Sequence, residues 1–391
     1  MFYQELIGLC TLATVFSIGA VWRVTRRRKP LVPETQDGRV RQHVPVSILK
    51  PLRGADDALD QNLDSFFNLD YQDHEIVFGV EGDRDPAIEV VRRLRRKYPS
   101  IKTRLVVHNG GRGLNPKVSN LLNMIDAGTH DVVLISDSNV SVGPGYLKEM
   151  TTLLQSGNTG LVTNLVAGTD EHSIGAAMEN LQLNGPVAAV VALSEMFGGR
   201  TLVVGKSMMF RRSVLERLGG LNAVANLLAE DYIIGKMFRM AGYDVRLCRT
   251  PVRNVCRRTT VREFVRRNLR WSLLRSRLKP FVYPLELIGN PVAVALVAPV
   301  FEVPSFWPMV WALSMILARD SFQTLMLRGR GNLAFILPLG LAKDLIMLFV
   351  WAAAPFCRHV AWRGHRLRIS AGTLLYAGEP MDEAGMIRVE G

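Results

Sequence analysis

The sequence predicts an α/β domain with a mostly parallel sheet, flanked by membrane-spanning segments at both ends of the chain. Uncharged apolar runs gather at the two ends, and between them short runs rich in Val and Ile alternate with helical patterns. The chain has 391 residues, enough for one sizeable domain with flanking segments. A hydrophobic content of 48% with 21% charged residues excludes a disordered chain, a collagen and a coiled coil.

The first apolar run extends from Leu6 to Trp22 and carries no charged residue. Its 17 residues span about 25 Å at 1.5 Å per residue, the lower limit for crossing a bilayer. A cleaved signal peptide is the alternative, but its basic cluster would precede the apolar run, whereas Arg26–Lys29 follow it. We therefore expect residues 1–25 to form a retained anchor, with the N-terminus outside and the next domain in the cytoplasm.

The central segment, residues 40–255, contains the alternating pattern of a doubly wound parallel sheet. The expected strands are Val44–Leu49, Glu75–Val80, Arg104–His108, Val132–Ser136 and Gly160–Val166. The expected helices include Pro86–Tyr98, Val118–Asp126, Pro144–Gln155 and Asn226–Met240. Ligands of such sheets bind at the carboxyl ends of the strands, so the residues that follow the strands are the candidates for function.

Asp137 and Asn139 come directly after the buried run Val132–Ser136. A carboxylate and an amide oxygen at that position suit a divalent cation, although Asp, Ser and Asn are also ordinary helix caps. Lys117 follows a Gly- and Pro-containing turn and is a candidate for a phosphate contact or a solvated surface lysine. The expected first strand is not followed by GxGxxG, and the sequence has no Walker motif, which argues against NAD and P-loop enzymes.

Two adjacent acids, Glu230 and Asp231, lie inside the helical pattern Asn226–Met240. They must face different directions, so one of them is expected to point into a cleft. The alternative is a first-turn acid that interacts with the helix dipole.

The basic segment, residues 256–282, holds nine basic residues and one acid between Arg257 and Lys279. A basic amphipathic stretch beside a membrane segment is typical of contact with an anionic leaflet. Much of the net charge of +13 therefore borders apolar segments, which disfavours nucleic-acid binding. Arg267 and Arg270 suit a diphosphate because the guanidinium fork matches phosphate oxygens, and Trp271 suits either this site or a membrane interface.

The C-terminal segment, residues 283–357, is expected to contribute two or three membrane segments. Leu287–Phe301 and Val303–Ala318 suit a hairpin, and Leu333–Phe356 carries Lys343 and Asp344 as an internal ion pair or a re-entrant feature. If all three cross, the basic tail, residues 358–391, lies outside and breaks the positive-inside rule. The tail is expected in the cytosol, which requires that one segment not cross. The four cysteines form no CxxC pair, as expected for a reducing compartment.

Taken in order, these segments resemble the ceramide glucosyltransferases, glycosyltransferase family 21, over about 230 residues from Val44 to Lys279. The residues that carry the resemblance are Ser47–Arg53, Asp85–Ala87, Asn115–Lys117, Asn120-Leu121, Asp137–Asn139, Ala229–Tyr232 and Arg267–Trp271. The resemblance implies a GT-A catalytic domain between membrane helices.

The resemblance also implies a role for each matching residue. Asp85 is expected near the nucleotide base, and Asp137 at the ribose and the metal as a variant of the DXD motif. Asn139 stands where many related transferases have Asp, so its role as a metal ligand departs from the family's pattern. Asp231 is expected to be the catalytic base. Donor-binding residues are completed by Lys117 and by Arg267, Arg270 and Trp271, which match the (Q/R)xxRW motif.

The implied reaction is an inverting transfer of glucose from UDP-glucose to the primary hydroxyl of ceramide, with Mg²⁺ or Mn²⁺ as cofactor. The alternatives are another UDP-sugar and lipid, such as UDP-GlcNAc and a hopanoid polyol, and a non-catalytic membrane-bound nucleotide or lipid binder. A processive polysaccharide synthase needs more membrane helices than this chain provides. The Arg-rich composition favours a bacterial inner membrane over Golgi or ER membranes.

Overall fold

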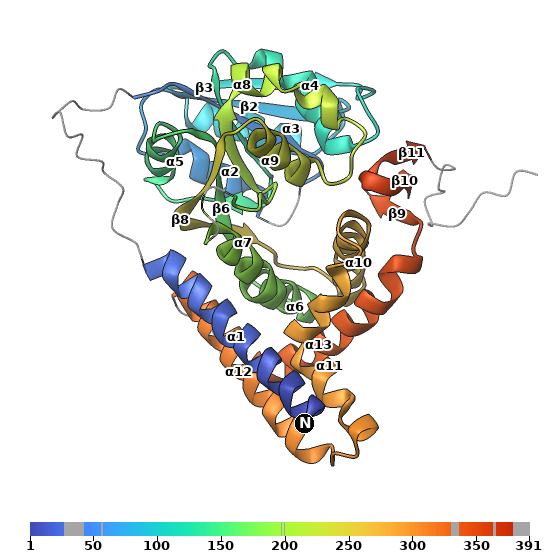
Figure 1. The fold of residues 1–391 in the computed structure, drawn as a ribbon. Helices are drawn as coiled ribbons and strands as arrows, with labels where there is room; N and C mark the ends of the chain where they lie inside the picture. The colour runs from blue at the N-terminus through green and yellow to red at the C-terminus, as the bar shows by residue number, and fades with distance from the viewer. Residues whose placement is uncertain are drawn as a thin grey trace, which may run out of the picture.

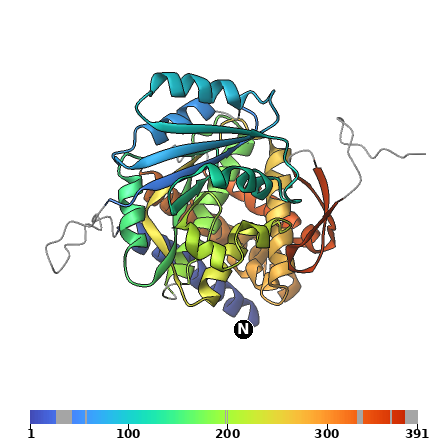
Figure 2. The same cartoon turned by 90° about the horizontal axis from the view of Figure 1, so that it is seen from above.

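The computed structural model describes residues 1–26, 43–55, 58–196, 198, 200–329, 336–362 and 365–377. A wide α/β domain lies above a narrower stem of helices, and the N-terminus lies at the tip of the stem (Figure 1). Viewed from above, the sheet crosses the domain and the C-terminal strands lie at its side (Figure 2). Residues 27–29 of the basic cluster and residues 378–391 of the tail lie outside the described residues.

The α/β domain is built on an eight-stranded sheet with the order β3-β2-β1-β4-β7-β6-β8-β5. Its strands are β1 (Val46–Leu52), β2 (His74–Glu81), β3 (Lys102–His108), β4 (Val132–Ser136), β5 (Val140–Ser141), β6 (Thr159–Thr169), β7 (Ser207–Arg211) and β8 (Asp244–Val255). Among these strands, four neighbouring pairs are parallel and three are antiparallel. The mostly parallel sheet predicted from the sequence is therefore confirmed, with β7 inserted antiparallel between β4 and β6.

All five strands expected from the sequence are present, with ends shifted by a few residues. The prediction omitted β5, β7 and β8. β7 has the sequence SMMFR, which lacks Val and Ile, and β8 alternates apolar and charged residues around Pro251. Both strands are shaped by their neighbours in the sheet, because β-propensity depends strongly on tertiary context.

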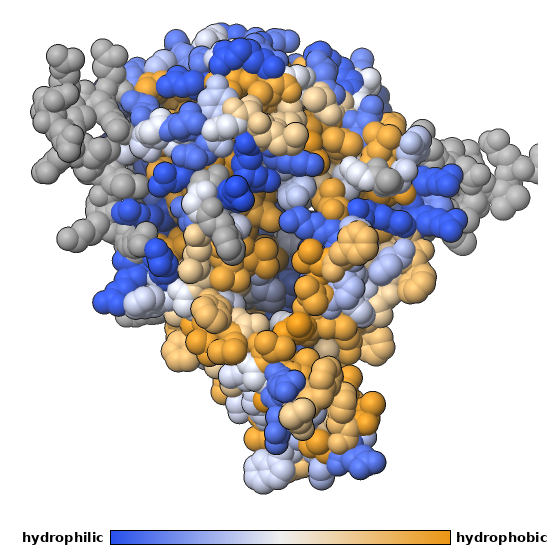
Figure 3. All heavy atoms as spheres, in the orientation of Figure 1, coloured by the Kyte–Doolittle hydropathy of each residue, from blue (hydrophilic) through white to orange (hydrophobic). Residues whose placement is uncertain are grey.

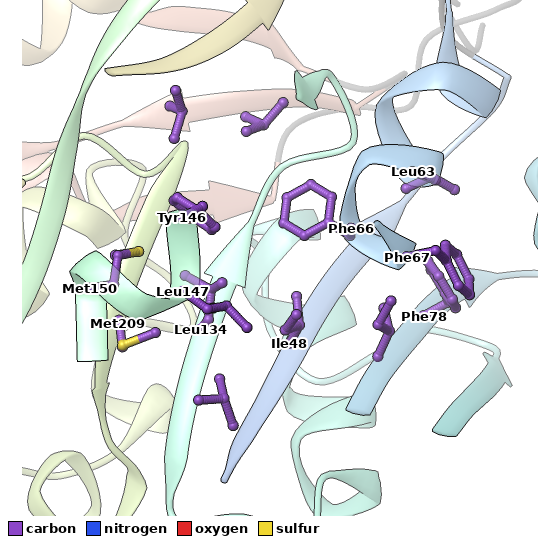
Figure 4. Close-up of a cluster of buried hydrophobic side chains, with 14 of the residues drawn as sticks. Ile48, Leu63, Phe66, Phe67, Phe78, Leu134, Tyr146, Leu147, Met150 and Met209 are labelled. Atoms are coloured by element: carbon purple, nitrogen blue, oxygen red, sulfur yellow. The ribbon is translucent and has the colours of Figure 1, made fainter. Parts of the chain in front are cut away.

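Helices cover both faces of the sheet, and successive strand residues alternate between the two cores. Ile48 and Leu134 point into one core with Phe66 and Phe78, whereas Leu49 belongs to the other. Figure 4 shows the first core, where the side chains of α2 and α5 meet the sheet. The helices of the domain are α2 (Leu59–Phe67), α3 (Ala87–Lys97), α4 (Pro116–Met124), α5 (Tyr146–Leu154), α8 (Arg212–Arg217) and α9 (Glu230–Met240).

The stem joins the first residues of the chain to its C-terminal third. Its long helices are α1 (Phe2–Arg26), α10 (Val261–Leu278), α12 (Phe306–Arg328) and α13 (Ile336–Ala353), and α6 (Ile174–Gln182) and α7 (Ala188–Glu195) connect it to the sheet. Trp311 donates a hydrogen bond to Thr11, and Gln323 donates one to Ser17. Because the later residue of α12 meets the later residue of α1, the two helices run in the same direction, toward the domain. On the face shown in Figure 3, apolar side chains cover much of the stem.

The segment Leu287–Phe301 does not form one helix. It breaks into a 3₁₀ turn (Tyr283–Gly289), the short helix α11 (Pro291–Leu296) and a second 3₁₀ turn (Ala298–Phe301). Pro284, Pro291 and Pro299 each begin one of these pieces, because proline lacks the N–H that would continue the preceding helix. Tyr3 donates to the carbonyl of Val294, which places this broken segment beside the first turn of α1.

By length and composition, two helices in the described part of the chain suit a membrane span: Phe2–Arg26 and Pro338–Phe356. α12 carries Arg319 and Asp320 and does not meet this criterion. These two residues form a buried four-charge cluster with Lys343 and Asp344 of α13. The ion pair Lys343–Asp344 expected from the sequence is present at 3.2 Å, within this larger cluster.

The last described residues form a small antiparallel sheet of β9 (His359–Trp362), β10 (His365–Ile369) and β11 (Leu375–Ala377). Leu228 donates its backbone N–H to Thr373, and Leu375 donates to the carbonyl of Asn226, at 3.0 and 2.8 Å. Leu367 and Leu375 are buried against Leu228. The C-terminal tail is therefore docked on the α/β domain.

Candidate active site

A group of charged side chains meets at the carboxyl end of β4. Asp137 follows this strand directly, and its carboxylate accepts from the ammonium of Lys117 at 2.9 Å. Lys117 lies in the first turn of α4, whose N-cap Asn115 accepts from the backbone N–H groups of Lys117 and Val118. The same ammonium lies 3.3 Å from Glu230, at the start of α9. Three segments far apart in the sequence thus converge on one lysine.

Lys117 is almost fully buried and is the centre of this group. Its ammonium also donates to the carbonyl of Gly205 at 2.7 Å. Burial opposes the charge of Lys117, but the nearby Asp137, Glu230 and Asp231 outweigh it and raise the pKa of Lys117. The lysine is therefore charged at neutral pH and unsuited to act as a base. The alternative of a solvated surface lysine is excluded.

Asp231 is held by the backbone on two sides. Its carboxylate accepts from the N–H of Gly205 at 2.6 Å and from its own neighbour Tyr232 at 2.7 Å. A Cβ at residue 205 would lie 2.9 Å from both Asp231 and Lys117, so only glycine lets the chain pass between them. Burial raises the pKa of Asp231, an effect that Lys117 and the two N–H groups only partly offset.

Glu230 is the more deeply buried of the two adjacent acids. It binds Lys117 with one oxygen and accepts from the side chain of Asn115 at 3.2 Å with the other. Burial raises the pKa of Glu230, and the charge of Asp231 adds to that rise while Lys117 opposes it. The two acids have different hydrogen-bond partners, although both lie near Lys117. Glu230 holds α9 against α4, whereas Asp231 faces the Gly205 loop.

Lys206 connects Asp137 with Asn139. Its ammonium lies 3.2 Å from the second oxygen of Asp137 and 2.8 Å from the side-chain oxygen of Asn139. Behind them, the fully buried Lys50 of β1 donates to the carbonyl of Asp137 at 2.6 Å and lies 3.8 Å from the ring centroid of Phe66. Burial lowers the pKa of Lys50 well below its ordinary value. Lys50 therefore stabilises the strand end as a hydrogen-bond donor.

The arginine–tryptophan motif lies on α10, which begins with a capping box of Thr260 and Glu263. Arg267 forms a 3.1 Å ion pair with the buried Glu179 of α6, and Glu179 raises the pKa of Arg267. Trp271 is half-buried and packs against the core cluster to which Val204 also contributes. The charge of Arg267 contributes, after burial, to lowering the pKa of Lys206, which pairs with Asp137. Arg270 is half-buried on the same helix.

Asp85 lies apart from this group. Its carboxylate accepts from the N–H of Gly54, after β1, at 2.8 and 3.1 Å, and from Ala87 at 2.8 Å. It follows β2, which is two positions from β4 in the sheet. The structure thus brings Lys117, Asp137 and Asp231 together and joins Asn139 to them through Lys206, while Asp85 lies farther along the same edge of the sheet.

The donor chemistry at Asp137 and Asn139 fits a hard divalent cation, because both side chains present oxygen to one point. That point is occupied by the ammonium of Lys206. Across the described ranges, no three His, Cys, Asp or Glu side chains gather into a metal site. Any cation bound here would therefore rely on few protein ligands, as Mg²⁺ does when a substrate phosphate completes its coordination.

The sequence did not predict the roles of several residues that the structure places in the site. Glu230 was recognised as part of a motif but given no role, and Lys206, Gly205 and Glu179 were not singled out. Lys206 precedes β7, a strand that was not predicted, so its register opposite Asp137 was not readable. Glu179 is 1% exposed. Its role depends on its burial and on its pairing with Arg267, and neither of these is visible in the local sequence.

The docked tail gives a prediction about the segment that precedes Asp231. Leu375→Asp places a charge where the side chain is 2% exposed, which costs several kcal/mol unless the tail detaches. We expect detachment to free residues 226–228 and to lower kcat by about tenfold, the equivalent of about 1.4 kcal/mol. Steady-state kinetics beside titration of a nucleotide ligand measures the effect. Tyr376→Asp is the matched control, because Tyr376 is 48% exposed. Equal kcat values for the two variants would contradict the coupling.

The sheet and the helices on its two faces have the architecture of the GT-A class of glycosyltransferases. The solved mannosyltransferase PcManGT from Pyrobaculum calidifontis, in complex with GDP-Man and Mn²⁺, is similar over 87% of this chain and 99% of its own, with a TM-score of 0.50 and 19% identity. This likeness establishes the fold. The chain belongs to glycosyl transferase family 21, whose sequence profile matches residues 6–375.

Two relatives from Caenorhabditis elegans are named ceramide glucosyltransferases. Ceramide glucosyltransferase 1 is 29% identical over 84% of this chain and 72% of its own length. Ceramide glucosyltransferase 3 is 30% identical over 62% of this chain and 52% of its own length. The expected family and GT-A fold are therefore confirmed, and the match extends beyond the central domain into both flanking segments.

Proposed function

We propose that this protein is a membrane-bound inverting glucosyltransferase that moves glucose from UDP-glucose to the primary hydroxyl of ceramide. The observation that carries the proposal is the convergence of Asp137, Lys117 and Asp231 at the carboxyl edge of the sheet. Membership of family 21 and the names of the two relatives support the lipid and the sugar.

Asp231 is the proposed base. It accepts the proton of the lipid hydroxyl as that oxygen attacks the anomeric carbon, and the bond from that carbon to the UDP oxygen breaks. Its two backbone hydrogen bonds hold the carboxylate in one orientation, and its raised pKa makes it a stronger base than an exposed aspartate. Inversion follows from this single displacement, because no enzyme nucleophile intervenes.

The departing UDP needs positive charge, and the chain supplies it from both sides. Lys117 is proposed to lie near the phosphates, and Arg267 and Arg270 on α10 to bind them through their guanidinium forks. Glu179 keeps Arg267 in place, and Trp271 completes the wall of the site. Asp85 is proposed to bind near the nucleotide base, farther along the sheet edge.

A divalent cation, Mg²⁺ or Mn²⁺, is the proposed cofactor, with Asp137 and Asn139 as its protein ligands. When bound it supplies positive charge for the diphosphate leaving group. The proposal rests on the oxygen donors of these two side chains.

The stem is proposed to lie in the membrane, with the catalytic domain on the cytosolic side; a bacterial inner membrane is favoured by the Arg-rich composition. α1 and the parallel α12 are proposed to cross, and the broken segment Leu287–Phe301 to return the chain to the far side. Arg328, at the end of α12, binds Glu171 of the domain, and the tail after α13 docks on the domain. Although α13 is apolar enough to cross, its end on the domain side and its buried charges suit a re-entrant α13, which leaves the tail in the cytosol.

The test is transfer from radiolabelled UDP-glucose to ceramide by purified protein in detergent, with Mg²⁺ or Mn²⁺, followed by product mass spectrometry. A labelled glucosylceramide is the expected result. A product only from UDP-GlcNAc, or only with a hopanoid polyol, would replace the donor or the acceptor. Failure to bind any UDP-sugar would refute the transferase function and favour a non-catalytic lipid binder.

The raised pKa of Asp231 predicts how the rate depends on pH. The base must be ionised to accept a proton, so kcat falls as pH drops through the pKa of Asp231. Because burial raises that pKa, the fall occurs at a higher pH than the ordinary aspartate value of about 3.9. A pH profile of kcat, compared with the pH profile of UDP binding, measures this acid limb. A kcat that stays constant down to the ordinary aspartate range would contradict the assignment.

A further inference from the structure

Lys206 is placed by the sheet and not by a loose loop. β4 and β7 pair antiparallel, with Ile135 opposite Met208 and Ser136 opposite Ser207. The next position in this register puts Asp137 opposite Lys206, and the N–H of Asp137 reaches the carbonyl of Lys206 at 3.4 Å. Directly opposed residues have Cβ atoms about 4.5–5.5 Å apart, so the two side chains are held together.

The ammonium of Lys206 occupies the point on which two oxygens converge. It lies 3.2 Å from Asp137 Oδ2 and 2.8 Å from Asn139 Oδ1, and the side chain is only 18% exposed. The other oxygen of Asp137 is paired with Lys117 at 2.9 Å. Each carboxylate oxygen of Asp137 therefore faces an ammonium, and Asn139, being neutral, adds no second negative charge for a metal ion.

An ammonium and a divalent cation repel each other strongly at such distances and cannot share one position. A metal ion that binds Asp137 and Asn139 must first displace Lys206. Without a metal ion, Lys206 still provides a positive charge at the carboxyl end of β4.

We propose that Lys206 is a donor-binding residue that acts as a built-in cation. Its ammonium holds the position between Asp137 and Asn139, allows nucleoside diphosphate to bind without a divalent metal, and weakens the binding of that metal by competition. This inference rests on the proposed function, since it assigns a residue to the same donor site.

The test compares wild type, Lys206→Met and Lys206→Arg in detergent, with Lys148→Met as the control. Lys148 pairs with Asp70 on the surface, so its loss removes a lysine without touching the site. Calorimetric titration measures the Kd of UDP in EDTA and in Mn²⁺. Electron paramagnetic resonance of free Mn²⁺ measures metal binding in the presence of UDP.

For wild type and Lys148→Met, the Kd of UDP is expected to differ by less than about threefold between EDTA and Mn²⁺. For comparison, the loss of one charge-assisted hydrogen bond to UDP would raise the Kd about tenfold. Lys206→Met is expected to lose about tenfold or more in UDP affinity in EDTA and to recover it with Mn²⁺. Its Mn²⁺ affinity should rise by about tenfold or more, because the competing charge is gone. Lys206→Arg should retain UDP binding in EDTA.

Two results overturn the inference. One is a wild type that loses UDP binding in EDTA as completely as Lys206→Met does. The other is an unchanged Mn²⁺ affinity in Lys206→Met. If Mn²⁺ restores UDP binding to Lys206→Met, the variant is folded, and its weaker binding in EDTA reports the lost charge. UDP binding by the wild type in Mn²⁺ tests the donor of the proposed function separately, so the two failures are distinguishable.

Discussion

Replacing Asp231 with Asn is expected to lower kcat by about 10²–10⁴-fold, the usual contribution of a positioned base. The substitution keeps the size of the side chain and one carbonyl oxygen, so one of the two backbone hydrogen bonds from Gly205 and Tyr232 remains available. It removes the negative charge and the proton acceptor. The loss should therefore appear in kcat, with the Kd of UDP-glucose within about threefold of wild type, because the base acts in the transition state and the substitution removes no ground-state contact to the donor.

Single-turnover kinetics with UDP-glucose and ceramide, beside calorimetric titration of UDP-glucose, separates chemistry from binding. Asp126→Asn serves as the control, since Asp126 is an exposed carboxylate paired with Arg212. If Asp231→Asn weakens UDP-glucose binding as much as it lowers kcat, Asp231 supports the donor site and is not the base.

Lys343→Met is expected to destabilise the protein by about 3–5 kcal/mol, the cost of leaving a buried ionic partner unpaired. Lys343 lies 3.0 Å from Asp320 and 3.2 Å from Asp344, and Arg319 binds the same two carboxylates. All four side chains are nearly inaccessible to solvent, and their charges sum to zero. Removing one cation leaves a net negative charge in the stem, where water is not available to solvate it.

Chemical unfolding in detergent, with a matched surface variant, measures this effect. Lys97→Met breaks the pair that the exposed Lys97 forms with Asp64 and should change the stability far less, because water screens this charge. The double variant Lys343→Met with Asp320→Asn should regain part of the lost stability, because the cluster is again neutral. A loss in Lys343→Met no larger than that in Lys97→Met would show that water or lipid headgroups reach the cluster.

Much of the site at the carboxyl edge of the sheet was predictable, because it depends on local sequence. Val132–Ser136 is an apolar run that must be buried, so the acid that follows it must lie at the end of a strand. The motif around Asp231 is similarly local, since a helical period forces adjacent acids in different directions. The central domain and its family were predictable for the same reason.

The flanking segments were less predictable. Uncharged runs at both ends predicted helices, and α1 and most of α12 follow them. The runs did not predict that Pro284, Pro291 and Pro299 break the first C-terminal segment. Composition also gave no sign that the tail docks beside Asn226, because that contact is made by two backbone hydrogen bonds between distant segments.

The amino-acid sequence was enough to predict which residues carry charge at the strand ends, where the apolar segments lie and to which family the chain belongs. These properties follow from periodicity and from local motifs. Three further features emerge from the folded chain: Lys206 lies between Asp137 and Asn139, Glu179 holds Arg267, and the tail lies on the α/β domain. Each depends on the register or packing of segments far apart in the chain, where hydrogen bonding and burial select partners that no local pattern records.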